Sequence, residues 1–424
     1  MRLRVATVIT RLEGGAGVLA LRGAKALSPE VYEMTIVTGS GDRLLAAAAD
    51  AGLETIIEPS LRAPIAPRSD LLALRRLCSV LRERDFDVVH THCAKAGALG
   101  RIAARKAGVP RIVHTYHGFP FHEFQSAARR QAYVFTERRL GLITDAVLCV
   151  GTGVAVEAVR RGLAAPQRVR TIGVAVDGVE AASVIAADAA DGVPVRTPQT
   201  CRRARAALGI PADATVVGAV GRLTYQKAPE HFVAALRELG RPDVIGVWVG
   251  SGELAERVAR LARTAPEVRV LLAGERADVP HILPAFDVFA LPSRYEGLPT
   301  AIVEAMVCGI PVVATAVNAV ADVVIPGETG LLVPPGRPGM LAAAVRHLLG
   351  SPDTAARLSA AARARLGERY GVSALRDALA AAYAPVCRSC SPAPAGYAPR
   401  LRNTCRASAS MSTEAGTSGS MHAS

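Results

Sequence analysis

Short apolar runs alternate with longer segments of helical periodicity along most of this 424-residue chain. Runs such as 3–9 and 244–249 have no polar face, which is typical of strands that are buried on both sides. The segments 71–83 and 253–263 between such runs have the spacing of helices. Strands separated by helices form parallel sheets with right-handed crossovers. We therefore expect an α/β fold with doubly wound, Rossmann-like sheets.

The apolar runs fall into two sets, which predicts two domains. The sets are 3–9, 34–38, 88–90, 111–115 and 146–150, and then 215–220, 244–249, 269–272, 288–291 and 311–314. Between them the chain is rich in Ala and then in Pro, Thr and Arg, without a clear period. We expect domains over 1–178 and 206–383, joined by a poorly ordered linker or insertion at 179–205. We leave open that the last helix packs back on the first domain.

The end of the chain, 384–424, consists largely of Ser, Ala, Pro, Gly and Thr. Such a segment has too few apolar residues to offset the entropy of ordering it, so we expect a disordered tail. The eight cysteines are scattered and only Cys387 and Cys390 form a close pair, which indicates reduced thiols rather than a zinc site. The scattered thiols indicate a cytoplasmic protein, and since no run reaches 18 apolar residues we expect no transmembrane helix.

Positive charge is concentrated in the first half of the chain. Residues 1–177 hold 25 basic and 16 acidic residues, whereas 206–383 hold 17 of each. A basic face suits nucleic acid, an anionic membrane surface or a phosphorylated acceptor, and a solvated surface is the plain alternative. Four arginines flank Tyr133 and Phe135 in an expected helix: Arg129, Arg130, Arg138 and Arg139. We hypothesise peripheral contact with the inner face of the plasma membrane there, against an ordinary solvated helix.

The most informative segment is 291–315, which reads as strand, loop, helix and strand. Glu296 and Gly297 lie in the loop, and the helix starts near Pro299 and Thr300. Free N–H groups at a helix start form an anion site. Glu304, one turn into the helix, can accept hydrogen bonds from a diol such as ribose. Solvated surface glutamates are the alternative, but apolar runs bracket both carboxylates at a junction.

Weaker signals follow other strands of the second domain. Arg222 and Lys227 follow a strand that ends at Gly221, where two cations can neutralise a diphosphate. Gly250 ends the next strand, and Arg276 follows a further one, near where a nucleobase can bind. Each is a weak signal by itself.

The first domain contributes a glycine loop and a group of histidines. Gly14, Gly15 and Gly17 follow the first strand but do not form a dinucleotide fingerprint. Histidines cluster at two later strand ends: His90, His92, His114, His117 and His122. Zinc is one interpretation, although no acidic or cysteine partner has a persuasive spacing. A hydrogen bond from His117 to a sugar hydroxyl is favoured, because Gly118 leaves room beside it.

Over residues 1–383 the chain resembles the family 4 glycosyltransferases, which have the GT-B architecture of two Rossmann-like domains facing a central cleft. Glu296 and Glu304 match the family's pair of glutamates eight apart, and the segments 221–227 and 327–335 match as well. In the first domain, the segments 90–101 and 117–121 resemble the subgroup that builds bacterial capsule, exopolysaccharide and lipid-linked glycans.

The resemblance implies a retaining, metal-independent hexosyltransferase without a cofactor. Its partners are a UDP- or GDP-sugar donor and a glycan or lipid-linked acceptor in cell-surface polysaccharide biosynthesis, and not nucleic acid. Arg222 and Lys227 would hold the diphosphate, and Glu304 the ribose. Glu296 and His117 would contact the donor sugar from opposite domains. The remaining donor-site residues would be Gly15, Gly250, Arg276, Gly297, Leu298, Pro299 and Thr300.

The chain departs from the family pattern at four places. Gly17 stands where glutamate is frequent, and 173–175 replaces the usual Pro-Asn-Gly. Ala228 stands where glycine often follows the lysine, and Asn318-Ala319 where Gly-Gly is common.

Two other functions remain open at this point. A nucleotide-sugar 2-epimerase of the same architecture would alter the donor without an acceptor, but no convincing acid–base pair is evident. A non-catalytic relative would hold a glycan. The paired glutamates disfavour nucleic acid, because they would repel its phosphates.

Overall fold

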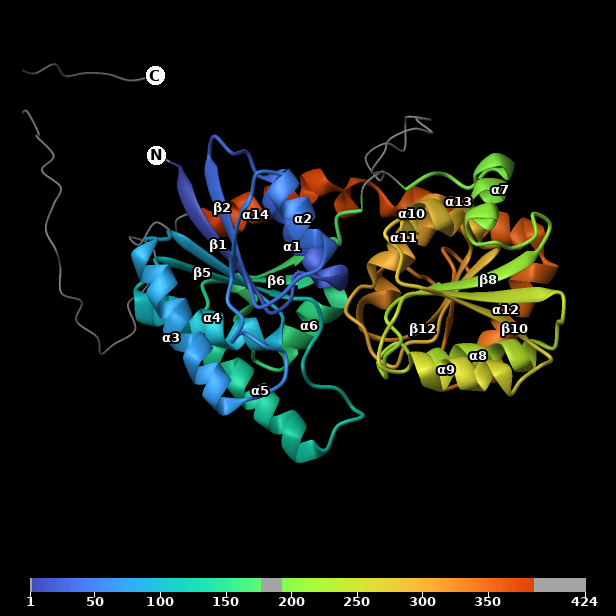
Figure 1. Ribbon diagram of the computed structural model, residues 1–424, viewed down its shortest axis with the longest axis horizontal. Coiled ribbons are helices and arrows are strands. Elements are labelled where there is room, and N and C mark those ends of the chain that lie inside the picture. The colour runs from blue at the N-terminus through green and yellow to red at the C-terminus, as the bar shows by residue number, and fades with distance from the viewer. Residues whose placement is uncertain (1, 177–192, 385–424) are drawn as a thin grey trace, which may run out of the picture. The chain divides into compact units, whose positions relative to one another are not determined.

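The computed structural model describes residues 2–176 and 193–384, and these form two parallel sheets with helices on both faces (Figure 1). The first sheet has the strand order β3-β2-β1-β4-β5-β6-β7, and the second has the order β10-β9-β8-β11-β12-β13. The expected α/β architecture of two doubly wound sheets is confirmed. Among the described residues, no helix has both the length and the apolar character needed to cross a bilayer.

The first half contains seven strands and six α-helices among the described residues. Its strands are β1 Leu3–Ile9, β2 Tyr32–Thr38, β3 Glu54–Ile57, β4 Val88–His92, β5 Arg111–Tyr116, β6 Ala146–Val150 and β7 Val169–Ile172. Its helices are α1 Gly14–Ala26, α2 Arg43–Asp50, α3 Pro67–Glu83, α4 Ala94–Ala107, α5 Ala127–Gly141 and α6 Thr152–Arg160, followed by the short η1 Pro166–Arg168.

The second half follows the same plan. Its strands are β8 Thr215–Val220, β9 Val244–Val249, β10 Arg269–Gly274, β11 Val288–Leu291, β12 Val312–Thr315 and β13 Leu331–Val333. Its helices are α7 Pro198–Ala207, α8 Pro229–Leu239, α9 Ala255–Arg263, α10 Val279–Ile282, α11 Thr300–Cys308, α12 Pro338–Gly350, α13 Pro352–Leu366 and α14 Val372–Tyr383. Short 3₁₀ turns are η2 Leu283–Ala285, η3 Asn318–Asp322 and η4 Glu368–Tyr370.

Three strands escaped the sequence patterns, and all three lie at sheet edges. β3 and β7 are the two edges of the first sheet, and β13 is an edge of the second. The residues of β3 are only partly buried or exposed, and two of the four residues of β7 are exposed. An edge strand has a neighbour on one side only, so its sequence lacks the continuous apolar run of a central strand.

The linker expected at 179–205 is wrong for its last part, because α7 begins at Pro198. Thr197 caps this helix with its side chain, which accepts a hydrogen bond from the Thr200 N–H. The guanidinium of buried Arg205 lies 2.9 Å from an oxygen of Asp287, which ties the helix to the second half. Residues 179–192 of this linker and 385–424 of the expected tail lie outside the described residues.

Helix α14 belongs to the core of the first half, although it lies near the chain's end. It packs against α1, β5 and β7. Leu375 and Leu379 are buried there. The Arg111 Nε donates to the carbonyl of Ala382 at 2.9 Å.

The strand order reverses once in each sheet, between β1 and β4 and between β8 and β11. At such a reversal the connections diverge to opposite faces, which leaves a crevice beyond the carboxyl ends of the two strands. The glycine loop follows β1, and the loop that carries Glu296 follows β11. The topology therefore places both motifs at crevices.

Candidate active site

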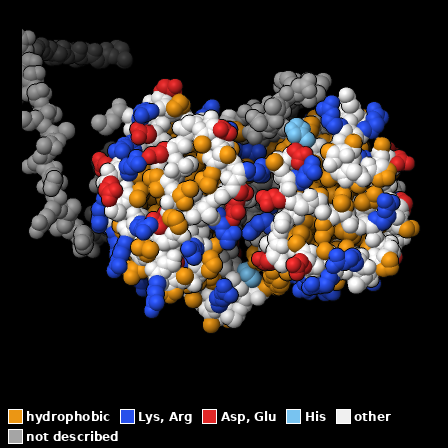
Figure 2. All heavy atoms as spheres, in the orientation of Figure 1, with side chains coloured by type: hydrophobic (Ala, Val, Ile, Leu, Met, Phe, Trp, Pro, Cys, Tyr) orange, Lys and Arg blue, Asp and Glu red, His pale blue; other side chains and the backbone are white. Residues whose placement is uncertain are grey.

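One cleft of about 1640 Å³ is lined by all twelve residues that the sequence singled out. They are Gly15 and His117 from the first half, and Arg222, Lys227, Gly250, Arg276, Glu296, Gly297, Leu298, Pro299, Thr300 and Glu304 from the second. Figure 2 shows basic and acidic side chains close together where the two halves meet. The fold thus gathers residues that are up to 289 positions apart (15 to 304) into one crevice.

Glycines at the ends of β8 and β9 let the backbone turn closely at this crevice. Gly250 has a φ of +133°, and a Cβ there would lie 2.2 Å from the carbonyl oxygen of Gly221. Larger residues would push these two strand ends apart. Glycine at position 250 is therefore required by the close contact between the two strand ends, in addition to the room that it leaves for a ligand.

The Glu296 carboxylate is 95% buried and held from several directions. Lys227 Nζ lies 2.6 Å from its Oε1, which also accepts a hydrogen bond from Ser293 Oγ at 2.6 Å. Gln226 Nε2 donates to its Oε2 at 3.0 Å. The sequence predicts that Lys227 binds the diphosphate of a donor. In the structure its ammonium group forms an ion pair with Glu296.

Two helix starts point into the cleft without side-chain caps. The N-cap residues Glu13 of α1 and Pro299 of α11 make no capping hydrogen bond. A Cβ on Gly15 would lie 3.5 Å from Thr300 Oγ1, so the two helix starts face each other closely. Each start presents backbone N–H groups and the positive end of a helix dipole. This arrangement suits an anion with several oxygens.

Arg222 adds an exposed positive charge to this anion site. Its side chain is exposed, and within the part of the chain that the structure describes its guanidinium has no ion-pair or hydrogen-bond partner. A free guanidinium fork can form paired hydrogen bonds to a phosphate.

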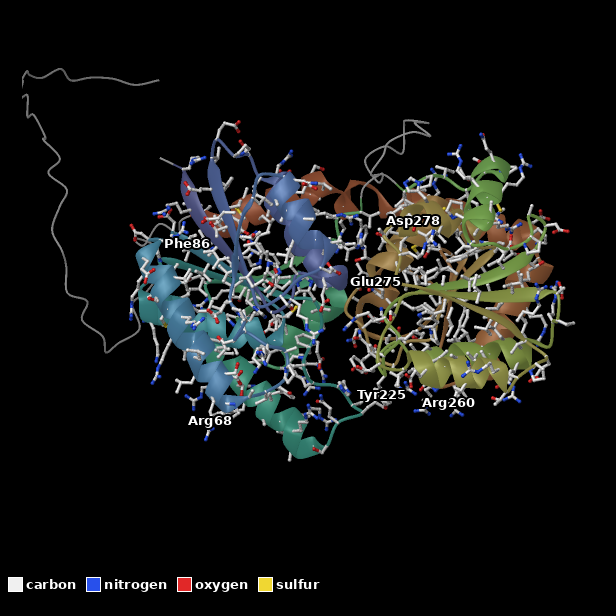
Figure 3. All side chains as sticks on the ribbon, in the orientation of Figure 1. Arg68, Phe86, Tyr225, Arg260, Glu275 and Asp278 are labelled. Carbon is white, nitrogen blue, oxygen red and sulfur yellow. The ribbon has the colours of Figure 1, made fainter. Side chains whose placement is uncertain are left out.

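Glu304 and Arg276 line the cleft from the second half. Glu304 is 91% buried on α11 and still lines the cleft. Arg276 forms a forked pair with Asp278 at 2.9 and 2.8 Å. The pair with Asp278 therefore engages the guanidinium of Arg276 before any ligand binds. The preceding residue, Glu275, lies at the edge of the second half that is turned toward the first (Figure 3).

The two halves touch through backbone at Gly118 and Gly297. A Cβ on Gly297 would lie 1.9 Å from the carbonyl oxygen of His117. Any side chain at position 297 would therefore force the halves apart. The contact keeps His117 beside the loop that carries Glu296.

A second contact between the halves is made by aromatic rings, two of which, His122 and Tyr295, line the cleft. The ring of His122 stacks on Tyr295 with centroids 4.1 Å apart, and Phe124 meets Tyr225 edge-on at 6.2 Å. In Figure 3, Tyr225 lies beside the loop between β5 and α5.

The histidines predicted to cluster do come together, on β4, β5 and the loop after β5. His92 Nδ1 lies 2.9 Å from His117 Nε2, and His90 contacts Tyr383 Oη and Thr115 Oγ1 at 2.7 Å each. Burial lowers the pKa of His117 to about 4. Burial, and then the charge of His117, lowers the pKa of His90 to about 3. Both rings are therefore neutral near pH 7.

Sequence reasoning missed three groups that hold the Glu296 loop. Gln226 and Ser293 bind the carboxylate, and Asn318 Nδ2 donates to the Glu296 carbonyl. Gln226 directly precedes Lys227 in the segment 221–227, which matches the family pattern. No pattern indicated Ser293, and Asn318 stood out only as a departure from the family pattern, because the role of both depends on contacts between segments that are distant in sequence.

Two family models match the chain, one on each half. The Glycosyltransferase Family 4 model matches residues 13–178, and the model for glycosyl transferases group 1 matches residues 202–365. The second match begins within α7, which agrees with that helix belonging to the second half.

Curated relatives are similar over most of the chain. The UDP-Gal:alpha-D-GlcNAc-diphosphoundecaprenol alpha-1,3-galactosyltransferase of Escherichia coli is 33% identical over 63% of this chain and 68% of its own length. The D-inositol 3-phosphate glycosyltransferase of Kineococcus radiotolerans is 32% identical over 71% of this chain and 72% of its own.

Solved structures share the fold. The Anabaena protein Alr3699/HepE, crystallised with UDP and glucose, superposes with a TM-score of 0.74 at 21% identity, over 90% of this chain and 99% of its own. The sucrose-phosphate synthase of Thermosynechococcus elongatus superposes with a TM-score of 0.69 at 21% identity, over 90% and 98%.

Proposed function

The chain belongs to the family 4 glycosyltransferases of GT-B fold, and from that premise we propose that it transfers a sugar from a nucleotide-diphosphate-sugar donor. The observation that carries this proposal is the single cleft, in which both helix starts, Arg222, Lys227 and Glu304 converge. A diphosphate matches the two helix starts and the cations, and a ribose diol matches the buried Glu304 carboxylate.

The donor side fits a leaving group that gains negative charge as the sugar departs. Preorganised N–H groups and cations stabilise such charge more in the transition state than in the ground state. Arg222 is free to bind it, and Lys227 lies where it can be shared between Glu296 and a phosphate oxygen. We assign these two cations to the diphosphate.

The surroundings of Glu296 favour retention through departure and attack on the same face of the sugar. A carboxylate nucleophile attacks through a lone pair of one oxygen, as in retaining hydrolases, and hydrogen bonds to its oxygens make that attack harder. Both oxygens of Glu296 already accept hydrogen bonds, from Lys227 and Ser293 on one and Gln226 on the other. We therefore propose that Glu296 orients Lys227 and the donor sugar, while the departing phosphate assists the acceptor.

The names of the relatives suggest the substrates. UDP-galactose and a diphosphoundecaprenol-linked sugar appear in the name of the E. coli relative, and UDP-glucose was crystallised with the Anabaena protein. We propose a UDP-hexose donor, a glycan or lipid-linked acceptor and a role in cell-surface polysaccharide biosynthesis. The absence of a metal requirement stays a prediction.

Contact with an anionic membrane also stays a prediction. Phe135 on α5 and Leu142, the C-cap residue that follows this helix, are largely exposed among arginines. Figure 2 shows Lys and Arg side chains over the surface of α3 and α5. Flotation with anionic vesicles at low salt is the test, and no binding would remove the idea.

A donor screen by thermal unfolding tests the function. A ligand at 100 times its Kd stabilises the fold by about 2.7 kcal/mol through mass action. UDP-hexoses should raise the midpoint by a few degrees more than GDP-hexoses, also in the presence of EDTA. Lys227→Ala and Glu304→Ala should abolish the shift.

Matched controls lie on the surface away from the cleft. Lys106→Ala and Glu328→Ala remove an exposed cation and an exposed carboxylate and should keep the full shift. Retention of the shift by both cleft variants would show that the donor site is wrongly assigned.

A further inference from the structure

The ring of His117 is held by a second histidine that does not reach the ligand space of the cleft. His117 Nε2 lies 2.9 Å from Nδ1 of His92, the last residue of β4. His117 lines the cleft, whereas His92 is 97% buried and does not line it. The contact occupies one of the two nitrogens of His117 and leaves Nδ1 for a ligand.

Both rings are neutral near pH 7, so a single proton lies between them. Burial lowers the pKa of His117 to about 4. Burial first, and then repulsion from the neighbouring histidines, lowers the pKa of His92 well below its ordinary value. One ring donates and the other accepts, and the direction decides which nitrogen of His117 carries hydrogen.

The far nitrogen of His92 settles the direction. His92 Nε2 is buried and has no hydrogen-bond partner among the described residues. If His117 donated, His92 would have to carry its proton on Nε2, as a buried N–H without an acceptor. If His92 donates through Nδ1, its Nε2 is only an unpaired lone pair. Buried orphan N–H groups are rarer in proteins than unpaired acceptors, which favours donation by His92.

The space beside His92 offers little relief to an N–H on Nε2. The cavity that borders His90 and His92 has a volume of about 10 Å³, at the lower limit for one water molecule. Most of its lining residues are apolar, with Leu19, Ile172 and Leu375 among them. The hydroxyl groups in its wall belong to Thr7, Thr115 and Tyr383, and the last two already pair with His90.

The orientation of His92 is fixed by its neighbours. The ring of His90 packs against it with centroids 4.2 Å apart. His90 is itself held at both nitrogens, by Tyr383 of α14 and Thr115 of β5.

We propose that His92 is a positioning residue that holds His117 in the tautomer with its proton on Nδ1, so that His117 presents an N–H donor to an electron-rich oxygen of the donor sugar. His117 then acts as a hydrogen-bond donor and not as a base. The identity of the oxygen rests on the proposed function, whereas the tautomer does not.

The tautomer is tested on the ligand-free protein. Protein labelled with ¹⁵N-histidine is studied at pH 7.5 by multiple-bond ¹H–¹⁵N spectra, and the signals are assigned by their loss in His92→Asn and His117→Gln. We expect His92 and His117 both to carry hydrogen on Nδ1 and a bare Nε2. Hydrogen on Nε2 of His117, a mixture of tautomers, or a charged ring would overturn the proposal.

A kinetic comparison separates positioning from a structural role. In His92→Leu, His117 loses its donor, and turnover of UDP-galactose should fall about tenfold, as for lost supporting hydrogen bonds elsewhere. The thermal shift caused by UDP alone should not change. His92→Asn keeps a donor near the position of Nδ1 and should recover part of the rate. Adding His117→Ala to His92→Leu should cost little more.

The outcomes distinguish this inference from the function. If the wild-type spectra show the Nδ1 tautomer but no nucleotide-sugar is bound or turned over, the tautomer stands and the function fails. If His92→Leu weakens UDP binding as much as it slows turnover, or leaves turnover intact, the positioning role is wrong. The wild-type spectra decide the tautomer even if the leucine variant does not fold.

Discussion

Three residues in this chain adopt left-handed backbone at places where its family usually has a flexible residue. They are Ala175, Ala228 and Asn318, with φ values of +48°, +50° and +42°. The family pattern has glycine or Pro-Asn-Gly at these places. These positions therefore have a backbone conformation that favours glycine, although none of them is glycine. Asparagine tolerates this conformation, whereas alanine is strained in it.

Ala228 provides a test of that strain. It precedes α8 directly after Lys227, so its backbone helps to aim the lysine. Ala228→Gly should stabilise the fold by about 0.5–1 kcal/mol, because relief of the left-handed strain exceeds the added entropy of the unfolded chain. Urea denaturation measures the change.

Ala234→Gly, in the right-handed interior of the same helix, is the matched control. It should destabilise the protein by about 1 kcal/mol. If both glycine variants lose stability alike, the left-handed strain at Ala228 is not significant.

At the scale of elements, the second half caps a helix of the first. Helix α6 begins after Gly151, which has no side chain to cap it. Asp322 of η3 accepts hydrogen bonds from the N–H groups of Thr152 and Gly153 instead. A Cβ on Gly151 would lie 2.6 Å from both the Ala319 Cβ and an Asp322 oxygen. The same turn reaches the Glu296 loop through Asn318.

This cap couples the closure of the two halves to the stability of one helix end. Asp322→Ala should remove about 1 kcal/mol of capping energy. Amide hydrogen exchange at Thr152 and Gly153 should then become faster, because these N–H groups lose their acceptor.

Asp353→Ala, in the first turn of α13, is the control for removing an aspartate near a helix start. It should leave exchange at 152 and 153 unchanged. Equal exchange in the wild type and Asp322→Ala would mean that the cap does not hold in solution.

At the scale of the whole molecule, α14 completes the core of the first half after the chain has built the second. Leu379 is 97% buried, and a Cβ on Gly23 of α1 would lie 2.9 Å from its Cδ1. Tyr383 reaches His90 in the first sheet. The stability of the first half therefore depends on residues more than 200 positions away (379 against 176).

Leu379→Ala should destabilise the first half by about 2–5 kcal/mol through the cavity that it leaves. The chain has one tryptophan, Trp248, which is buried in the second half and reports on that half by fluorescence. Circular dichroism should show part of the helix signal lost at lower urea, while the Trp248 transition stays in place.

Leu348→Ala is the mirror control, because Leu348 is equally buried in α12 of the second half. It should move the Trp248 transition. A joint shift of both signals by Leu379→Ala would show instead that the halves unfold as one unit.

Much of the fold follows from local patterns that the sequence carries by itself. Central strands such as β9 and β11 are continuous apolar runs, and helix starts such as Thr300 carry their own signals. Edge strands lack such signals, since their stability comes from their neighbours. Helix α7 has a start signal in Thr197 and Pro198, but its attachment to the second half depends on a distant partner, Asp287. Glu296, Glu304, Arg222 and Lys227 could be recognised because each stands at a strand end or helix start.

Amino-acid order alone determined two doubly wound sheets, a helix start beside two carboxylates, and cations after β8. Only the tertiary structure decided that Lys227 pairs with Glu296, that Asp322 caps α6, and that His92 orients His117. The physical reason is the distance along the chain over which each effect acts. Periodicity and backbone preference act over a few residues, whereas hydrogen-bond partners and buried charges are set when distant segments pack together.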